Sequence, residues 1–277
     1  MLLSIVLALA GSAPSFDYDA AAPTNLQVSG DAVTFSGAHG RKVSGVLYRA
    51  ATPGRHAAVL FVHWLGDPAT TNHTEFDADA RALAARGADC LLVDAMWSKP
   101  DWFETGRTTA TDARDSIDQI IDLRRSLDVL LAQPDVDPAR VAYVGHDFGA
   151  MYGAVLAGVD PRPRYFVLMA GVDSFSDWYL LGKKPADVKS YEAEMAPYAP
   201  TAWLAKSTAL GFLFQFSAHD RYVSAAQAAA FAQAAPLPRG VFYYNSDHSL
   251  AVPDARTDRL AWLMSRLLFI PGRALGK

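Results

Sequence analysis

Cysteine and long apolar runs are both scarce in this sequence. Cys90 is the only cysteine among the 277 residues, so no disulfide can form within the chain, and its apolar surroundings are typical of a buried strand. No apolar run is long enough to cross a bilayer, and no segment is repeated. The sequence therefore indicates neither a disulfide framework nor a membrane-spanning or repeat architecture.

An excess of charge of one sign is also absent. The chain has 25 Lys and Arg residues against 29 Asp and Glu residues, which gives a net charge of −4 at pH 7. The two signs are interspersed, and this argues against nucleic acid as a partner. No pair of histidines has the HExxH spacing or a similar ligand spacing, so we expect no metal site and no cofactor. The 51% apolar content is ample for a buried core.

The first 24 residues are predicted to be a leader and a linker. Residues 2–10 are apolar, and Ala8-Leu9-Ala10 fits a small-x-small cleavage site, although a basic n-region is missing. This pattern favours an export signal within residues 1–10 and an exported or periplasmic protein. The alternative is a cytoplasmic protein whose leader stays attached and packs on the domain. Residues 12–24 are polar and rich in Pro and Ala, and we expect a linker there.

The remaining chain predicts one α/β domain over residues 25–277. Residues 31–50 have the pattern of a β-hairpin with a glycine-bearing turn. Apolar runs then alternate with segments of helical periodicity. Further strands are predicted at residues 57–62, 89–95, 141–144, 165–170, 212–217 and 241–244. Helices are predicted at residues 72–86, 111–132, 224–234 and 253–268, and directly after the strand at 141–144.

Two helix starts carry a capping pattern, and one segment breaks the alternation of strands and helices. Asn72 with Glu75, and Ser224 with Gln227, have the spacing of a capping box at a helix start. Residues 171–210 lack a clean strand pattern and predict a small, cap-like helical insertion over the sheet edge. A hairpin followed by strand–helix alternation predicts an open, mostly parallel sheet with helices on both faces.

A sharp turn between a strand and a helix is predicted at residues 145–149. Gly145 and Gly149 flank Asp147 in the small-x-nucleophile-x-small pattern of a nucleophile elbow. Glycine at both ends lets the strand and helix backbones approach closely and tolerates strained dihedral angles. The residue at the apex is Asp147, where hydrolases of this shape more often carry Ser or Cys.

Polar residues also follow three other predicted strands. In open α/β sheets, sites form beyond the C-terminal ends of the strands. The residues at these positions are His63 and Trp64, His219 and Asp220, and Asp247 and His248. The chain order nucleophile, acid, histidine selects Asp147, Asp220 and His248 as a catalytic triad, with Asp247 as the less favoured acid.

The chain resembles the α/β-hydrolase superfamily over residues 30–268. The segments LDVLLAQPDVDPARVAYVGHDFGA, FQFSAHDRYV and YNSDHSL resemble the bacterial dienelactone-hydrolase-like and peptidase-like esterase branch. The apex departs from that branch, which would place Cys or Ser where Asp147 stands. An aspartate there, in GHD followed by an aromatic residue and Gly, is similar to the epoxide-hydrolase and haloalkane-dehalogenase branch. The resemblance implies an α/β-hydrolase fold and a hydrolase.

A carboxylate at the apex implies different chemistry from a serine. Asp147 needs no base to activate it, and it suits attack on an sp3 carbon that bears an epoxide or a halide. His248 would then activate the water that cleaves the ester of Asp147, while Asp220 orients His248. The backbone N–H groups of Trp64 and Phe148 are expected to form the oxyanion hole.

Two alternatives to this covalent hydrolase remain open. Asp147 and His248 could activate water directly without a covalent step, or the chain could be a catalytically silent binding protein. For a hydrolase of either kind, the expected substrate is a small organic ester, lactone, epoxide or carbon–halogen compound. In every case we expect a small-molecule ligand, and the oligomeric state is left open. The side chains expected at the substrate pocket are His63, Trp97, Tyr191 and Tyr198. Phe148 weighs against dehalogenation, since a Trp there would add an indole donor for a halide.

Overall fold

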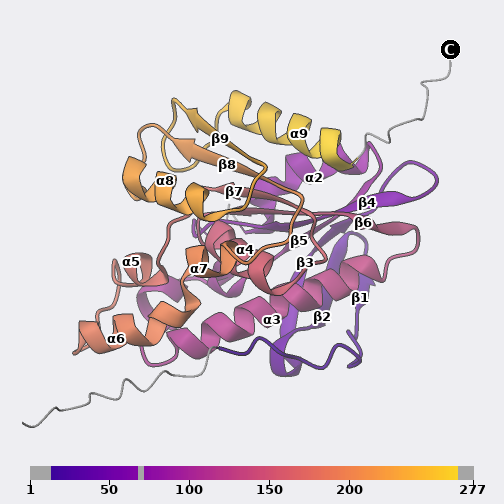
Figure 1. The fold of residues 1–277 in the computed structure, drawn as a ribbon. Coiled ribbons are helices and arrows are strands. Elements are labelled where there is room, and N and C mark those ends of the chain that lie inside the picture. Colours follow the sequence, from indigo (N-terminus) through magenta and orange to yellow (C-terminus); the bar gives the residue numbers. More distant parts are fainter. Residues whose placement is uncertain (1–13, 68–71, 268–277) are drawn as a thin grey trace, which may run out of the picture.

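The computed structural model describes residues 14–67 and 72–267. Its centre is a nine-stranded sheet with the order β1-β2-β3-β5-β4-β6-β7-β8-β9 (Figure 1). The strands are β1 (Gln27–Ser29), β2 (Ala32–Ser36), β3 (Lys42–Tyr48), β4 (His56–Val62), β5 (Ala88–Val93), β6 (Val136–His146), β7 (Tyr165–Met169), β8 (Gly211–Ser217) and β9 (Arg239–Tyr244). The predictions for residues 1–10 and for residue 268 fall outside the described residues.

The pairing of the strands confirms the predicted sheet. Strands β1, β2, β3 and β5 pair antiparallel in that order, and all pairs from β5 through β4 to β9 are parallel. Every residue of β4 and β5 is buried. Parallel strands are buried on both faces because the crossover helices cover them, which is why these strands read as continuous apolar runs.

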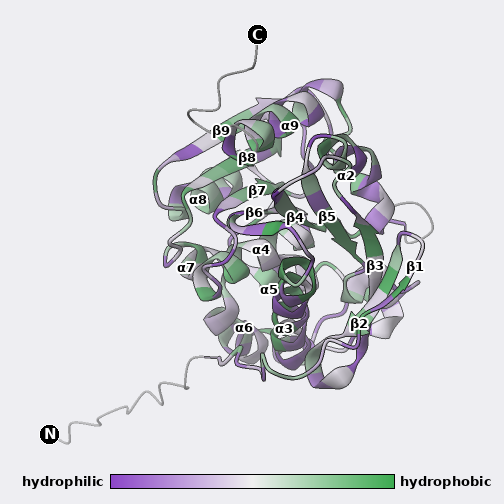
Figure 2. Cartoon of the chain, turned by 90° about the vertical axis from the view of Figure 1, so that its right-hand side faces the viewer, coloured by the Kyte–Doolittle hydropathy of each residue, from purple (hydrophilic) through white to green (hydrophobic). Residues whose placement is uncertain are grey.

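Helices cover both faces of the sheet. The helices are α2 (Asp77–Ala84), α3 (Asp112–Leu131), α4 (Phe148–Val159), α5 (Phe175–Tyr179), α6 (Val188–Met195), α7 (Pro200–Leu204), α8 (Ala225–Ala234) and α9 (Pro253–Leu267). Helices α2 and α9 pack together on one face, and α3, α4, α7 and α8 form the layer on the other (Figure 1). Figure 2 shows hydrophobic colour along the central strands β4 and β5, whereas α3 carries both colours. None of the helices described has the length and apolarity that a bilayer crossing requires.

Some local predictions were wrong. The backbone before α2 forms a 3-10 turn, His73–Phe76, and the side chain of Asn72 makes no capping bond there. Ser224 and Gln227 do form the predicted capping box of α8. Strand β6 begins at Val136 rather than at residue 141. The prediction missed its first half because that part is mostly exposed and rich in polar and turn-forming residues. The short, exposed strand β1 was not predicted.

The insertion between β7 and β8 is helical, as expected, but only part of it lies near the sheet's C-terminal edge. Helix α5 packs close to the elbow through Trp178, whose ring contacts the ring of Phe148. Helix α7 instead packs against α4 and α8, and so belongs to the helical layer. A cap over the sheet edge therefore describes α5 but not α7.

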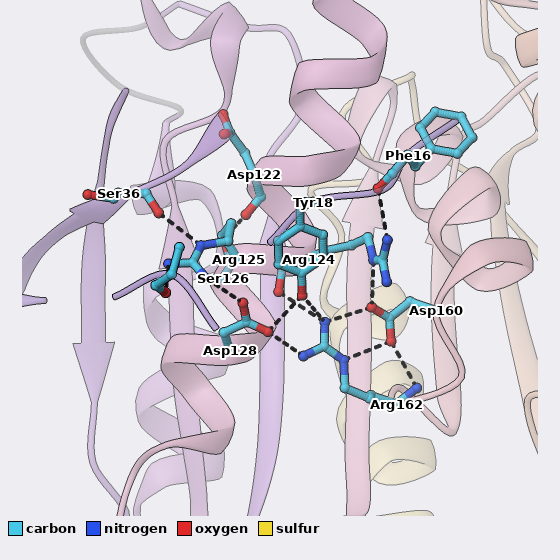
Figure 3. Close-up of polar contacts among 11 residues, drawn as sticks. Phe16, Tyr18, Ser36, Asp122, Arg124, Arg125, Ser126, Asp128, Asp160 and Arg162 are labelled. Atoms are coloured by element: carbon cyan, nitrogen blue, oxygen red, sulfur yellow. Dashed lines mark hydrogen bonds and ion pairs between the residues drawn. The ribbon is translucent and has the colours of Figure 1, made fainter. Parts of the chain in front are cut away.

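The segment before β1 is packed on the domain, which differs from the expected linker. Phe16 is only 5% exposed, and its ring meets the rings of Tyr198 and Trp203. The Tyr18 hydroxyl donates to Asp128, and Arg124 donates to the carbonyl of Phe16 (Figure 3). The prediction failed because its evidence was the polar, Pro- and Ala-rich composition, and buried Phe16 outweighs that composition.

Candidate active site

Asp147 lies at the apex of a strained turn between β6 and α4. Its φ of 58° and ψ of −120° fall in a region that non-glycine residues rarely adopt, and such strain is concentrated at functional sites. A Cβ added to Gly145 would overlap the backbone of Gly149, and one added to Gly149 would overlap the backbone of Val62. Both glycines are therefore needed for the close approach of strand and helix that produces this turn.

Asp147 has one oxygen held by the backbone and one facing a histidine. The N–H of Leu65 donates to Oδ2 of Asp147 at 2.6 Å. Oδ1 lies 3.8 Å from Nε2 of His248. Asp147 is 5% exposed and His248 is 8% exposed, so little water screens this pair. The free oxygen of Asp147 and the histidine thus face the same space.

Asp220 orients His248 from the opposite side of the ring. Oδ2 of Asp220 lies 2.8 Å from Nδ1 of His248, and Oδ1 accepts the backbone N–H groups of Tyr222 and Val223. Burial opposes ionisation of Asp220, but the hydrogen bond from His248 and its charge outweigh burial and lower the pKa of this carboxyl. Asp247 bonds to Ser249 instead. The structure therefore places Asp220, and not Asp247, against His248.

His248 is held in its charged form by two carboxylates. Burial lowers its pKa, but the carboxylate of Asp147, 3.8 Å away, and the hydrogen bond and charge of Asp220 raise the pKa to about 9. The resting state at neutral pH is therefore an imidazolium between two carboxylates. In that state Nε2 carries a proton, and it is directed towards Oδ1 of Asp147.

The oxyanion-hole prediction needs one correction. The N–H of Trp64 donates to Oε2 of Glu75 at 2.8 Å and does not reach Asp147. The next N–H along the loop, that of Leu65, reaches Asp147 instead. Phe148 begins α4, so its N–H belongs to a first turn that has no intrahelical acceptors. A shift of one residue along the loop after β4 turns the N–H of Trp64 away from the site, and the sequence alone did not reveal that shift.

The four side chains predicted at the pocket do not line it. His63 is 1% exposed and bonds to Trp64 and Ser98, and burial lowers its pKa. Trp97 is equally buried and donates its indole N–H to the carbonyl of His63. Tyr191 donates its hydroxyl to Asp112, and Tyr198 packs against Phe16. These residues support the site from beneath or lie away from it.

A cavity of about 680 Å³ opens in front of Asp147 and His248. Five of its lining residues are Trp, Phe or Tyr, and the others include charged and polar side chains. The lining residues are Trp64, Leu65, Phe103, Glu104, Phe148, Trp178, Leu181, His219, Arg221, Tyr222, Asp247 and Ser249. The volume falls within the range of sites for small organic ligands. Within the described residues, no group of three His, Cys, Asp or Glu side chains is arranged to hold a metal ion.

Several residues that line or support this site were not assigned to it from the sequence, among them Leu65, Glu75 and Tyr222. Leu65 acts through its backbone, so its side chain gave no signal. Glu75 was assigned to a capping box, yet its carboxylate binds the N–H of Trp64 and lies 2.6 Å from Nδ1 of His146. Only Tyr222 had a usable signal, since it follows Asp220 by two residues.

Comparison with solved structures places this architecture among known folds. No protein-family model matches the sequence, and no curated protein matches it. The acetyl xylan esterase from Paenibacillus sp. R4 is 16% identical, with 88% of this chain and 90% of that chain covered and a TM-score of 0.70. Acetyl xylan esterase 1 from Thermoanaerobacterium sp. JW/SL YS485 is 17% identical, with 87% and 86% covered and a TM-score of 0.66. The esterase domain of a Rhodothermus marinus protein is 19% identical, with 84% and 95% covered and a TM-score of 0.63. The chain therefore has the α/β-hydrolase fold.

Proposed function

We propose that this chain is a hydrolase that forms a covalent ester between Asp147 and its substrate. The substrates would be small organic molecules with an electrophilic sp3 carbon, either an epoxide or an alkyl halide. Asp147 is the nucleophile, His248 handles the proton, and Asp220 orients His248. The fold supports a hydrolase in general, because the similar solved structures are named as esterases.

The bond between Leu65 and Asp147 carries this proposal. In a serine esterase the oxyanion-hole donors hold the carbonyl oxygen of the substrate. Here the N–H of Leu65 holds Oδ2 of the nucleophile itself. Attack by Oδ1 on an sp3 carbon makes Oδ2 the carbonyl oxygen of the new ester, already at its donor. The N–H of Leu65 then stabilises the negative charge that develops there when the ester is hydrolysed.

The first step opens the epoxide. Oδ1 of Asp147 forms a bond to one ring carbon, and the bond from that carbon to the ring oxygen breaks. The alkoxide takes the proton from Nε2 of His248, which is an imidazolium in the resting state because its pKa is raised to about 9. The products of this step are a neutral hydroxyalkyl ester and a neutral imidazole.

The second step returns the enzyme to its starting state. His248 takes a proton from water while the water oxygen bonds to the carbonyl carbon of the Asp147 ester. The tetrahedral intermediate places its charge on the oxygen held by Leu65. Its collapse expels the alkoxide, which takes the proton of the new carboxyl group. Asp147 is again a carboxylate, His248 is again an imidazolium, and the net reaction adds one water.

An epoxide fits this arrangement better than an alkyl halide. The alkoxide needs a proton, and His248 supplies it, whereas a halide leaves without one. With a halide, His248 must lose its proton before it can act as the base in the second step, which adds a step that an epoxide does not need. Phe148 also offers a leaving halide no side-chain donor. Tyr222, whose ring centre lies 5.0 Å from that of His248, adds a hydroxyl to the pocket wall.

The second candidate function is hydrolysis of an ester by water that Asp147 and His248 activate together. The esterase names of the similar structures favour it. Attack of Asp147 on an ester carbonyl would give an anhydride, which is energetically less convenient than an ester. In this candidate, activated water therefore attacks the substrate directly, without a covalent step on Asp147. The two candidates therefore differ in whether the oxygen of water enters Asp147.

The test combines a trapped intermediate with labelled water. His248→Ala is expected to accumulate an adduct on Asp147 in intact-mass spectra with alkyl halides, which leave without a proton, and to do so more slowly with epoxides, whose opening uses the proton of His248. Wild type that turns over substrate in water enriched in heavy oxygen is expected to carry the label in the carboxylate of Asp147. His39→Ala, a change at an exposed histidine outside the site, is the control.

Label that enters only the product would contradict the covalent step and favour direct activation of water. Binding without turnover by wild type would indicate a silent binding protein.

A further inference from the structure

Glu75 and His146 form a second acid–histidine pair directly behind the first one. His146 precedes the nucleophile and is fully buried, and its Nδ1 lies 2.6 Å from Oε1 of Glu75. Its other nitrogen, Nε2, lies 3.0 Å from the backbone carbonyl oxygen of His248. The second oxygen of Glu75 accepts the N–H of Trp64. The pair therefore bonds to both loops that carry the catalytic groups.

The contacts fix the number of protons on the pair. A carbonyl oxygen can only accept, so Nε2 of His146 must carry a proton and donate it to His248. A second proton must lie between Nδ1 and Glu75, because two lone pairs would repel at 2.6 Å. That proton is on the imidazole or on the carboxyl group. In either case the pair holds one proton more than a neutral histidine beside a carboxylate.

Loss of this shared proton would break one of the two links. If the remaining proton stays on Nε2, the Nδ1 lone pair faces the carboxylate of Glu75. If it moves to Nδ1, the Nε2 lone pair faces the carbonyl of His248. The ring of Trp64 stacks on the ring of His146, with ring centres 5.3 Å apart and an angle of 2° between the planes, and this contact holds the imidazole in place.

We propose that Glu75 and His146 are positioning residues that share one proton and so hold the His248 loop and the Trp64–Leu65 loop in register with Asp147. The geometry rests on contacts of this chain alone, whereas the effect on turnover rests on the proposed function. Sliding of either loop would separate Nε2 of His248 from Asp147, or the N–H of Leu65 from Oδ2. Misplacement by about 1 Å costs on the order of 100-fold in rate.

Other titratable groups surround the pair and act on the same proton. The ring centre of His248 lies 5.5 Å from that of His146. On the side of Glu75 lie His63 and the ion pair of His73 with Asp94. Asp220 lies beyond His248. A variant that removes the shared proton without disturbing these groups gives the cleanest test.

Glu75→Gln is that variant. The amide N–H of glutamine can donate to Nδ1 of His146, its oxygen can accept the N–H of Trp64, and His146 stays neutral with the proton on Nε2. All three contacts survive without a shared proton. Glu75→Leu removes both contacts of Glu75. Glu192→Gln, a change at an exposed position of α6, is the matched control for the loss of a carboxylate.

The experiment compares these variants by turnover and by NMR. Glu75→Leu is expected to lose about 100-fold in kcat with a smaller change in KM. Glu75→Gln is expected to keep turnover near the wild-type level, because all three contacts survive. Without substrate, the downfield Nδ1 proton of His248, bonded to Asp220, is expected to persist in Glu75→Gln and to disappear in Glu75→Leu.

Two results would overturn the proposal. One is a Glu75→Leu variant that keeps both turnover and the His248 proton signal. The other is a Glu75→Gln variant that loses both, since that would assign the effect to the charge of Glu75. If Glu75→Leu does not fold, the turnover and the proton signal of Glu75→Gln decide the matter. If wild type has no turnover, the proposed function fails, and the NMR comparison still tests the positioning role.

Discussion

His248 is the residue whose charge links stability to pH. Its pKa is about 9 in the folded state, compared with 6.5 for an unperturbed histidine, because Asp147 and Asp220 favour the imidazolium despite burial. A histidine with a raised folded pKa stabilises the fold fully below its unfolded pKa. That contribution is lost as the pH rises through about 9. A shift of this size corresponds to at most about 3 kcal/mol.

We therefore predict that the free energy of unfolding falls between about pH 6.5 and about pH 9 by up to about 3 kcal/mol through His248. Urea unfolding of wild type and His248→Gln at a series of pH values checks this, since the variant lacks the titrating group. Asp147→Asn removes the carboxylate that raises the pKa most, so its decline in stability should be smaller and should end at lower pH. A decline in His248→Gln equal to that of wild type would assign it to other groups.

Residue-level predictions from sequence succeeded where position along the chain carried the information. Asp147, Asp220 and His248 each follow a strand of the parallel sheet, and the structure brings the three together. The predicted oxyanion-hole role of Trp64 and the predicted capping role of Glu75 were wrong for a different reason. Backbone N–H direction depends on dihedral angles that sequence spacing does not specify, and the carboxylate of Glu75 found tertiary partners that outweighed a local cap.

At the level of elements, the close approach of β6, α4 and β4 sets the nucleophile in place. The elbow was predictable because glycines at both ends are a local requirement of the turn. Of the two elbow glycines, Gly149 is the better position at which to test this packing. A methyl group there would overlap the backbone carbonyl group of Val62 and press on that of His63. Backbone atoms in the middle of a sheet cannot move aside as a flexible side chain can.

We predict that Gly149→Ala lowers the free energy of unfolding by about 1–3 kcal/mol, the usual cost of overpacking. Gly106→Ala is the matched control, since an added Cβ there would make only ordinary contacts, at 3.7 Å and beyond. Urea unfolding of both variants checks the difference. Equal stability of the two variants would mean that the elbow can relax, and would argue against tight packing as the origin of the strained turn. A loss of turnover in Gly149→Ala greater than its loss of folded protein would show that the strain also positions Asp147.

At the level of the whole molecule, the fold was predictable because its signals are periodic. Buried parallel strands read as apolar runs, and amphipathic helices such as α3 show a helical period, so element order and sheet type followed. Segments without periodicity were not predictable. Strand β1, the exposed first half of β6 and the residues before β1 have no repeating pattern, and their placement depends on which distant surfaces they meet.

The residues before β1 give the last test, because they connect distant parts of the fold. Phe16 is buried against Tyr198 and Trp203 of the insertion, and the polar network in Figure 3 ties the same segment to α3 and to Arg162. A linker would contribute nothing to stability, whereas a packed Phe contributes about 3–5 kcal/mol. We predict that Phe16→Ala lowers the Tm by about 10 °C, given about 2–4 °C per kcal/mol for a chain of this size. Leu237→Ala, at a side chain that is 77% exposed, should leave the Tm unchanged.

Because the ring of Phe16 contacts Tyr198 and Trp203 of the insertion, its loss should also loosen the segment that carries Trp178. Hydrogen exchange in α5–α7 should then rise more than in β4–β6. Uniform exchange in both regions would confine the role of Phe16 to global stability.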